Sequence, residues 1–224
     1  MRRPQRRVGG ALAALLPLVL GASAAAQQRP VAAEEPALEA RSHRRGAVAV
    51  GLGVGVFEMT NAADSWDAVF DGPMTSFGLY LEVGLARRWL ATLAADWGTA
   101  DGEQVLLTDP PQPTGVDVSL DYEPIHLTLG WVAWARERWR LHLGLGPTVV
   151  RWSEAAGPRS RSATDYGGHA LVGLRREVGR FSLGGDLRWS AIPDAVGDGG
   201  VSEYFGEDDI GGLGLTLLGA YRLR

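Results

Sequence analysis

The sequence contains no cysteine and no lysine, so all 22 of its basic residues are arginine. Without cysteine it can form neither disulfides nor metal–thiolate sites. Beyond residue 26, no stretch approaches the roughly 18 unbroken apolar residues that identify a transmembrane helix. Positive charge is also scarce: without the four arginines of residues 1–26, 18 arginines face 26 acidic residues, a net charge of −8. A protein with a net negative charge is not expected to bind nucleic acid, so we expect no nucleic-acid partner.

The first 26 residues have the pattern of a secretory signal peptide. Arginines at positions 2, 3, 6 and 7 precede an apolar segment at 8–21, and small residues at 22–26 offer cleavage sites. An N-terminal membrane anchor is the alternative, but the apolar segment is shorter than the roughly 20 residues needed to span a bilayer. Residues 27–45 are polar and rich in Ala and Pro, which is typical of a flexible periplasmic lead-in. Residues 46–224 then form one domain.

Within this domain, eight segments alternate between large apolar residues and small or polar ones. In the first, Val48, Val50, Leu52, Val54 and Val56 share one face, and Ala and Gly share the other. This two-residue period is that of a β-strand. Three short connectors alternate with four long ones, at 86–88, 136–138 and 177–180 and at 61–75, 101–117, 153–163 and 192–209. An even number of strands with alternating tight turns and long loops is typical of outer-membrane barrels.

The two faces favour a membrane barrel over a soluble β-sandwich or a lipocalin-like barrel. The less apolar face is dominated by Gly, Ala and Thr, which suits a narrow lumen. Trp89 and Trp97 share a face eight residues apart, a climb of about 20 Å that is close to the apolar band of a barrel with its aromatic girdles. We therefore predict an all-β fold, an eight-stranded antiparallel up-and-down transmembrane β-barrel. Its aromatic girdle is predicted to consist of Phe77, Trp89, Trp97, Trp131, Trp139, Phe181, Trp189 and Tyr221.

One strand departs from this regular pattern. The alternation slips at Pro124, where we expect a bulge or a strand edge, because proline cannot donate a ladder hydrogen bond.

Ten charged or histidine side chains fall on the inward face of these strands. They are Glu82, Asp96, His126, Arg140, His142, His169, Arg175, Asp186, Arg188 and Arg222. Eight strands leave an interior that side chains roughly fill, and buried charges must be paired. We therefore expect a structural polar network that plugs the lumen. A gated narrow pore and a metal or small-ligand site are the alternatives, because two His and two carboxylates could bind a metal.

His126-Leu127-Thr128 is similar to the His-x-Ser strand motif of a barrel family that deacylates lipid A. A threonine beside a histidine can act as a nucleophile. Both side chains are predicted to face the lumen, however, whereas a site that cleaves lipid must face lipid. We therefore expect no enzymatic activity, no catalytic residues, no cofactor and no bound metal.

The long connectors carry most of the acidic residues, and the short turns carry arginines. The connector at 192–209 has six acids and no base. Self-repulsion is expected to keep these connectors mobile. Alternatively, their carboxylates could hold Ca²⁺ or Mg²⁺ against lipopolysaccharide phosphates. Four aromatics in them could pack the first connector on the last or anchor a partner, and we favour packing: Trp66, Phe70, Tyr204 and Phe205.

Taken together, residues 46–224 resemble the small eight-stranded outer-membrane barrels of the OmpA/OmpX type. The signal peptide, the eight strands, the loop asymmetry and the girdles carry this resemblance. It implies a monomer in the bacterial outer membrane with both termini in the periplasm. Its implied partners are outer-membrane lipids, lipopolysaccharide and the barrel assembly machinery. The expected role is structural or surface-interacting, a narrow solute channel or carrier is the second possibility, and a lipid-modifying enzyme is the third.

Overall fold

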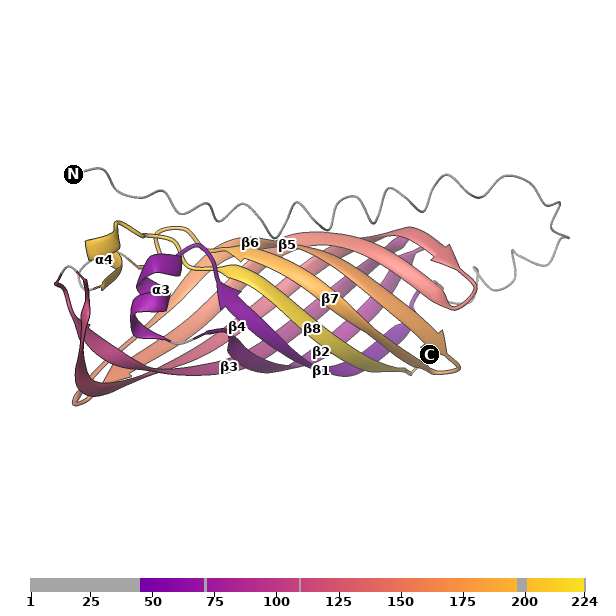
Figure 1. Cartoon of the computed structure of the whole chain (residues 1–224). Helices are drawn as coiled ribbons and strands as arrows, with labels where there is room; N and C mark the ends of the chain where they lie inside the picture. The colour runs from indigo at the N-terminus through magenta and orange to yellow at the C-terminus, as the bar shows by residue number, and fades with distance from the viewer. Residues whose placement is uncertain (1–44, 71, 109, 197–200, 224) are drawn as a thin grey trace, which may run out of the picture. The chain divides into compact units, whose positions relative to one another are not determined.

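The computed structural model describes residues 45–70, 72–108, 110–196 and 201–223. The predicted signal peptide at 1–26, and the predicted lead-in at 27–45 except its last residue, lie outside these described residues. The described residues form eight strands and two short helices (Figure 1). In chain order these are β1 (Val48–Met59), α3 (Ala63–Val69), β2 (Met74–Ala86), β3 (Trp89–Leu106), β4 (Gln112–Arg136), β5 (Trp139–Ala156), β6 (Arg159–Val178), β7 (Phe181–Ala191), α4 (Val201–Phe205) and β8 (Gly212–Arg222).

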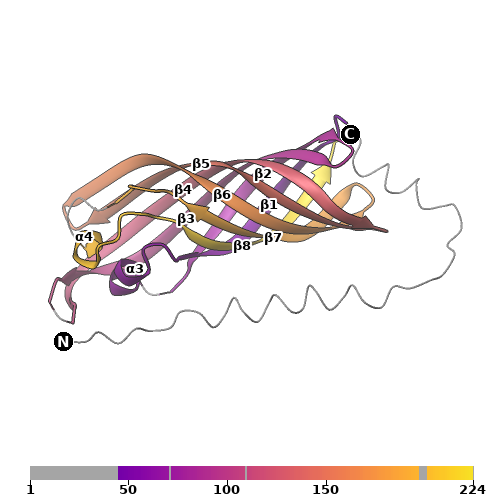
Figure 2. The same cartoon turned by 90° about the horizontal axis from the view of Figure 1, so that it is seen from above.

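Every strand pairs antiparallel with the next one in sequence, and β8 pairs with β1 to close the ring. The predicted eight-stranded antiparallel barrel is thereby confirmed. Three short turns and the strand ends at Val48 and Arg222 lie at one end of the barrel, which we call the turn end. The helices α3 and α4 lie at the opposite end, which we call the loop end (Figure 1 and Figure 2).

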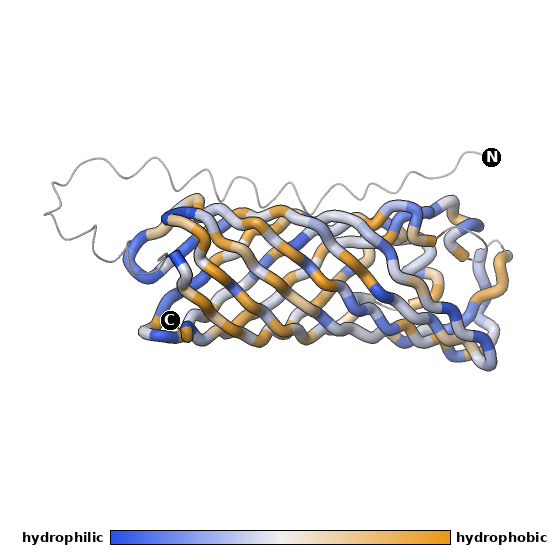
Figure 3. The backbone as a smooth tube through the Cα atoms, turned by 180° about the vertical axis from the view of Figure 1, so that it is seen from behind, coloured by the Kyte–Doolittle hydropathy of each residue, from blue (hydrophilic) through white to orange (hydrophobic). Residues whose placement is uncertain are grey.

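The outer face of the barrel wall is apolar and exposed. Leu52, Leu145 and Leu217 are 66%, 68% and 64% exposed, although large apolar side chains would be buried in a water-soluble protein. In Figure 3 these strands appear as a band of orange segments between bluer ends. The apolar face thus points away from the barrel axis, as contact with lipid requires. In a soluble β-sandwich the apolar face would point toward the core instead.

Aromatic side chains stand at both margins of this apolar band. Phe77 stacks on Trp97 toward the loop end, with ring centroids 5.4 Å apart, and Phe181 meets Tyr221 at the turn end, with centroids 5.1 Å apart. Trp134 also faces outward and is 46% exposed, which the sequence pattern did not predict. The other four predicted girdle residues lie on the outer face as well, namely Trp89, Trp131, Trp139 and Trp189.

The expected bulge at Pro124 is wrong. Pro124 pairs in register with Val150 of β5, and the ladder to β3 is only interrupted there before the same register resumes. A missing N–H removes one hydrogen bond without shifting the strand. The register shift occurs instead between Val132 and Trp134, where it turns the Trp134 indole outward.

Two of the four predicted long loops are strands rather than loops. The connector at 101–117 belongs largely to β3 and β4, and the connector at 153–163 largely to β5 and β6, which pair without a break from Trp139–Arg176 to Ala156–Arg159. Gly157, with φ of 57°, closes the second hairpin. The expectation of mobile connectors is therefore wrong for these two segments, because their backbones are hydrogen-bonded to a neighbouring strand and not to water.

The barrel wall thus continues past its apolar band into a part that we call the head. It consists of the described parts of residues 57–73, 99–123, 150–165 and 192–211. Its interior is a hydrophobic core built by inward side chains of the wall and by both helix-bearing connectors, with Met59, Trp66, Tyr122, Val150, Trp152, Ile192 and Ile210 among its buried members. The head therefore rests on ordinary core packing.

Candidate functional site

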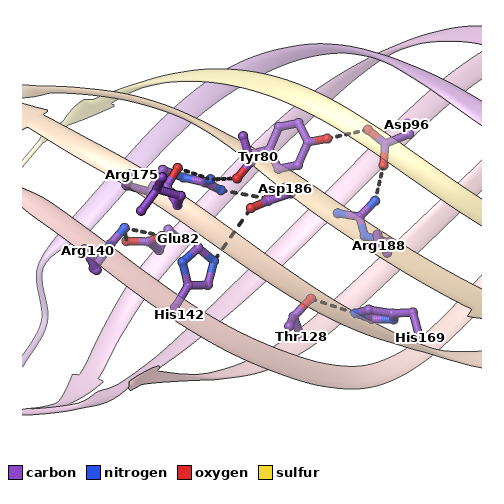
Figure 4. A network of polar contacts seen from close by, with 12 residues as sticks. Tyr80, Glu82, Asp96, Thr128, Arg140, His142, His169, Arg175, Asp186 and Arg188 are labelled. Atoms are coloured by element: carbon purple, nitrogen blue, oxygen red, sulfur yellow. Dashed lines mark hydrogen bonds and ion pairs between the residues drawn. The ribbon is translucent and has the colours of Figure 1, made fainter. Parts of the chain in front are cut away.

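The structure places all ten predicted inward residues in the lumen, where most of them gather into two clusters. Figure 4 labels members of both clusters, among them Glu82, Asp96 and Asp186. The cluster nearer the turn end is ionic. Arg140 lies 2.8 Å from Glu82 and Arg175 lies 2.7 Å from Asp186, whose carboxylate also has His142 at 3.8 Å. Below them, Arg222 pairs with Glu177, an acid that the sequence pattern did not place in the lumen. Each of these arginines therefore has a carboxylate partner, as buried charges require.

The second cluster surrounds Asp96. Its carboxylate accepts a hydrogen bond from Tyr80 Oη at 2.7 Å and one from Arg188 Nη1 at 2.8 Å. His126 Nε2 lies 3.7 Å from the same carboxylate. Tyr80 comes from β2, Asp96 from β3, His126 from β4 and Arg188 from β7, so this cluster reaches across the lumen.

A chain of hydrogen bonds continues from His126 along the wall. Thr148 Oγ1 lies 2.9 Å from His126 Nδ1 and 2.9 Å from His169 Nδ1, and His169 Nε2 lies 2.8 Å from Thr128 Oγ1. A hydroxyl donates only one proton. The Asp96 carboxylate favours the proton of His126 on Nε2, so Thr148 donates to His126, His169 donates to Thr148, and Thr128 donates to His169. The position of the Asp96 carboxylate thus determines which group is the donor in each hydrogen bond of this chain.

Glycines make room for these polar groups. A Cβ at Gly78 would lie 2.0 Å from Asp96 Oδ1. At Gly173 it would lie 2.1 Å from His142 Cε1 and 2.3 Å from Asp186 Oδ1. The small face of each strand is therefore the space into which long polar side chains from neighbouring strands extend, which explains why the inward face is poor in large residues.

Paired polar side chains line the lumen from Glu82 to Asp96. Thr128 and His169 form the nucleophile–base geometry that the His-x-Thr motif suggested, but the partner is His169 rather than His126, and both side chains are buried. A nucleophile must meet its substrate, and these groups meet only the lumen wall. Within the described residues, no group of three His, Asp or Glu is placed to hold a metal ion.

The head contains a cavity of about 790 Å³, which the sequence pattern did not reveal. Its apolar wall includes Trp66, Phe70, Tyr122 and Trp152, and its polar groups come mainly from the β5–β6 hairpin. Arg161 lies over the Trp152 ring, 5.4 Å from its centroid. Its volume falls within the range of small-molecule sites, which are largely apolar with a few placed polar groups.

Glu154 and Arg161 face this cavity from paired positions of β5 and β6. Glu154 keeps contact with solvent, yet the protein around its carboxyl group raises its pKa through desolvation. The positive charge of Arg161 opposes this rise in pKa without cancelling it. The polar side of the cavity therefore holds a weakened acid beside two arginines, Arg159 and Arg161.

The helix-bearing connectors are joined to each other over the cavity. The Glu207 carboxylate accepts hydrogen bonds from the backbone N–H groups of Asp64 and Ser65 at 3.0 and 2.9 Å. Trp66 is buried and stacks against Phe70, and Tyr204 donates to the Thr108 carbonyl. For Trp66 the structure therefore agrees with the prediction that the aromatics of the first connector pack on the last one, since Trp66 lies in one buried cluster with Ile192 and Ile210. Figure 2 shows α3 and α4 at the same end of the barrel.

The fold defines a class: this chain is an eight-stranded transmembrane β-barrel of the outer-membrane type. One similar structure is the attachment invasion locus protein Ail of Yersinia pestis in complex with the heparin analogue sucrose octasulfate. It is 15% identical, has a TM-score of 0.50, and the match covers 80% of this chain and 100% of Ail. Neisserial surface protein A is 12% identical with a TM-score of 0.50, and 80% and 98% are covered. No family model and no curated protein matches the sequence.

Among the described residues, neither helix is long and apolar enough to cross a membrane.

Proposed function

We propose that this protein is an outer-membrane barrel with a closed lumen that acts through its head, in a structural or surface-interacting role. The observation that supports the proposal is the network of paired polar side chains that extends along the lumen from Glu82 to Asp96. We place the turn end in the periplasm and the head outside the cell, because short turns are periplasmic in barrels of this type.

A narrow channel or carrier for small solutes is the second candidate, and one observation favours it. Four buried polar atoms in the lumen have no hydrogen-bond partner, namely Arg140 Nε, His142 Nδ1, Asp186 Oδ1 and Arg188 Nε. Buried polar groups are normally satisfied, so water would be expected beside them. All four belong to residues that form the ion pairs of the lumen.

Planar-bilayer recording separates the two candidates. The wild-type barrel should give no stepwise conductance, because no ion can pass the paired side chains without breaking them. Asp96→Ala combined with Arg188→Ala removes both partners of one pair and should introduce small conductance steps. Regular steps from the wild-type protein would contradict the closed lumen.

The head supplies the surface through which we expect the protein to act. Its cavity offers an apolar wall to a small molecule or to a side chain of a partner, and its acidic connectors favour a basic partner or divalent cations that bridge to lipopolysaccharide phosphates. Equilibrium dialysis with ⁴⁵Ca²⁺ tests the cation route. Unchanged calcium binding after neutralising Glu203, Asp208 and Asp209 would contradict it.

The proposed orientation has a direct test on intact cells. Protease added outside should cut within residues 192–209 and leave the arginine-rich turns intact. Labelling of residues 136–138 from outside would reverse the orientation. We propose no lipid-modifying activity, since Thr128 and the two histidines His126 and His169 are buried. Lipid A with an altered mass in cells that produce the protein would contradict this.

A further inference from the structure

Two arginines stand on the lipid-facing surface at the turn end. In the cross-strand register, Arg136 of β4 lies opposite Trp139 of β5, and Trp139 lies opposite Arg176 of β6. All three residues are exposed on the outer face, and Trp139 holds the middle position of the three in the cross-strand register. We call this row the Arg–Trp–Arg row.

Contacts within the row fix its geometry. The guanidinium carbon of Arg176 lies 5.6 Å from the centroid of the Trp139 ring, a cation–π contact. The next row toward the membrane centre is apolar and consists of Trp134, Leu141 and Leu174. The arginines therefore lie at the margin of the apolar band, where a lipid acyl chain meets its headgroup.

No carboxylate neutralises these two charges among the described residues, where every ion pair of an arginine lies in the lumen. Glu177, the neighbour of Arg176 in sequence, turns inward and binds Arg222. Outward positions at the turn end of the other strands are apolar or aromatic, with Val48, Leu85, Trp89, Phe181 and Tyr221. The Arg–Trp–Arg row thus places two positive charges on outward strand positions, in addition to the arginines of the turns, of which Arg180 hydrogen-bonds the Tyr221 hydroxyl.

The opposite margin of the wall differs in sign. There the outward arginine of β5, Arg151, pairs in register with Glu123 of β4, and Asp121 lies two residues further along. Arg151 therefore has a carboxylate residue opposite it in the cross-strand register, whereas Arg136 and Arg176 both lie opposite Trp139. An anion at the turn end would complete the Arg–Trp–Arg row, and arginine binds phosphate with paired hydrogen bonds that lysine cannot make.

We propose that the Arg–Trp–Arg row binds the phosphate of an anionic phospholipid in the leaflet at the turn end. Arg136 and Arg176 hold the phosphate, Trp139 lies at the glycerol level, and Trp134, Leu141 and Leu174 contact the acyl chain. The choice of a phospholipid over lipid A rests on the orientation proposed above, which places the turn end in the periplasmic leaflet.

Native mass spectrometry of the refolded full-length mature barrel tests this site. With phosphatidylglycerol and phosphatidylethanolamine in equal amounts, the wild-type protein should retain phosphatidylglycerol. Arg136→Gln with Arg176→Gln should weaken its retention about thirtyfold, since each arginine near a lipid surface strengthens the attraction about fivefold. Trp139→Leu should weaken it less.

The control is Arg87→Gln with Arg88→Gln, which removes the same charge at the same end but from the β2–β3 turn. It should keep the preference. An equal loss in the control, or no preference in the wild-type protein, overturns the site, and so does full displacement of phosphatidylglycerol by an equal amount of lipid A. Heat-dependent gel migration confirms that each variant is folded. Bilayer conductance is read separately, so an open lumen and a missing lipid site are distinguishable.

Discussion

The inward face of the barrel wall is ionic in the membrane section and apolar in the head. On β5 alone, Arg140 and His142 face the lumen between salt-bridged neighbours, whereas Val150 and Trp152, on the same face, are buried in a hydrophobic core. The outward face changes in the opposite sense, from Leu143 and Leu145 to Arg151 and Ser153. Along the single strand β5, the apolar side chains therefore face outward in the membrane section and inward in the head.

The difference follows from what lies outside the wall. Where lipid surrounds the strands, apolar side chains must point outward, and a narrow interior is left for hydrogen-bonded polar groups. Where water surrounds them, the apolar side chains return to the inside. The change in pattern thus marks the height at which the surrounding solvent changes. The three predictions below test this contrast.

The largest effect is expected in the membrane section of the lumen. Asp186→Ala leaves Arg175 buried without its partner and should lower the free energy of unfolding by about 3–5 kcal/mol. Glu82→Ala should cost less, because the side chain of Glu82 is 22% exposed and so gives up less of its hydration in the folded protein. Urea titration in lipid vesicles measures both variants.

A double variant sharpens this first prediction. Arg175→Met with Asp186→Leu removes both charges and should recover most of the loss, because apolar replacement of a whole buried pair is often neutral. A loss as small as that of a surface substitution for Asp186→Ala would mean that water reaches the lumen. The lumen and the interior of the head would then differ in the polarity of their side chains but not in how well those side chains are shielded from water.

The second prediction concerns the outer face of a single strand. Leu145→Arg should cost about 2–4 kcal/mol, the range for a charge on the lipid face near the bilayer centre. Ser153→Arg lies on the same face of β5 but in the head, and it should change the free energy of unfolding by less than about 0.5 kcal/mol, as surface substitutions do. Similar losses in the two variants would mean that the head is also immersed in lipid.

The smallest effect is expected from the contact between the two helix-bearing connectors. Glu207→Ala removes the acceptor for the N–H groups of Asp64 and Ser65 and should cost about 1 kcal/mol, as loss of a helix cap does. The cost should fall on the head alone. Hydrogen exchange should rise in Ala63–Val69 while β1 stays protected, and faster exchange throughout the barrel would show that head and wall unfold together.

The membrane section was predictable because its pattern is simple. A two-residue period with large apolar residues on one face is sufficient to assign the strands and the inward positions of residues such as Asp96, Arg140 and Asp186. The head was missed because its outward face is polar, so a search for apolar alternation ends where the lipid ends. Continuing the phase from Arg140 and His142 to Thr148, Val150 and Trp152 would have extended β5 correctly.

The ion pairs within the lumen could not be predicted from the sequence, for a different reason. The pairs Arg188–Asp96 and Arg140–Glu82 join strands that are not neighbours in sequence. The stagger of the strands around the ring decides which inward residues meet, and alternation within one strand carries no information about it. The cavity was hidden for the same reason, since its walls come from connectors far apart in the chain.

The ring is closed by its first and last strands, which pair from Ala49–Arg222 to Met59–Gly212. This seam joins residues separated by more than two-thirds of the chain, so it is the last contact that a growing polypeptide can make. Until β8 arrives, β1 and β7 both present unpaired backbone edges, and these cannot be left in lipid. Insertion is consequently all-or-none: a chain that lacks β8 is an open sheet with two reactive edges, and a membrane cannot accept it as a smaller barrel.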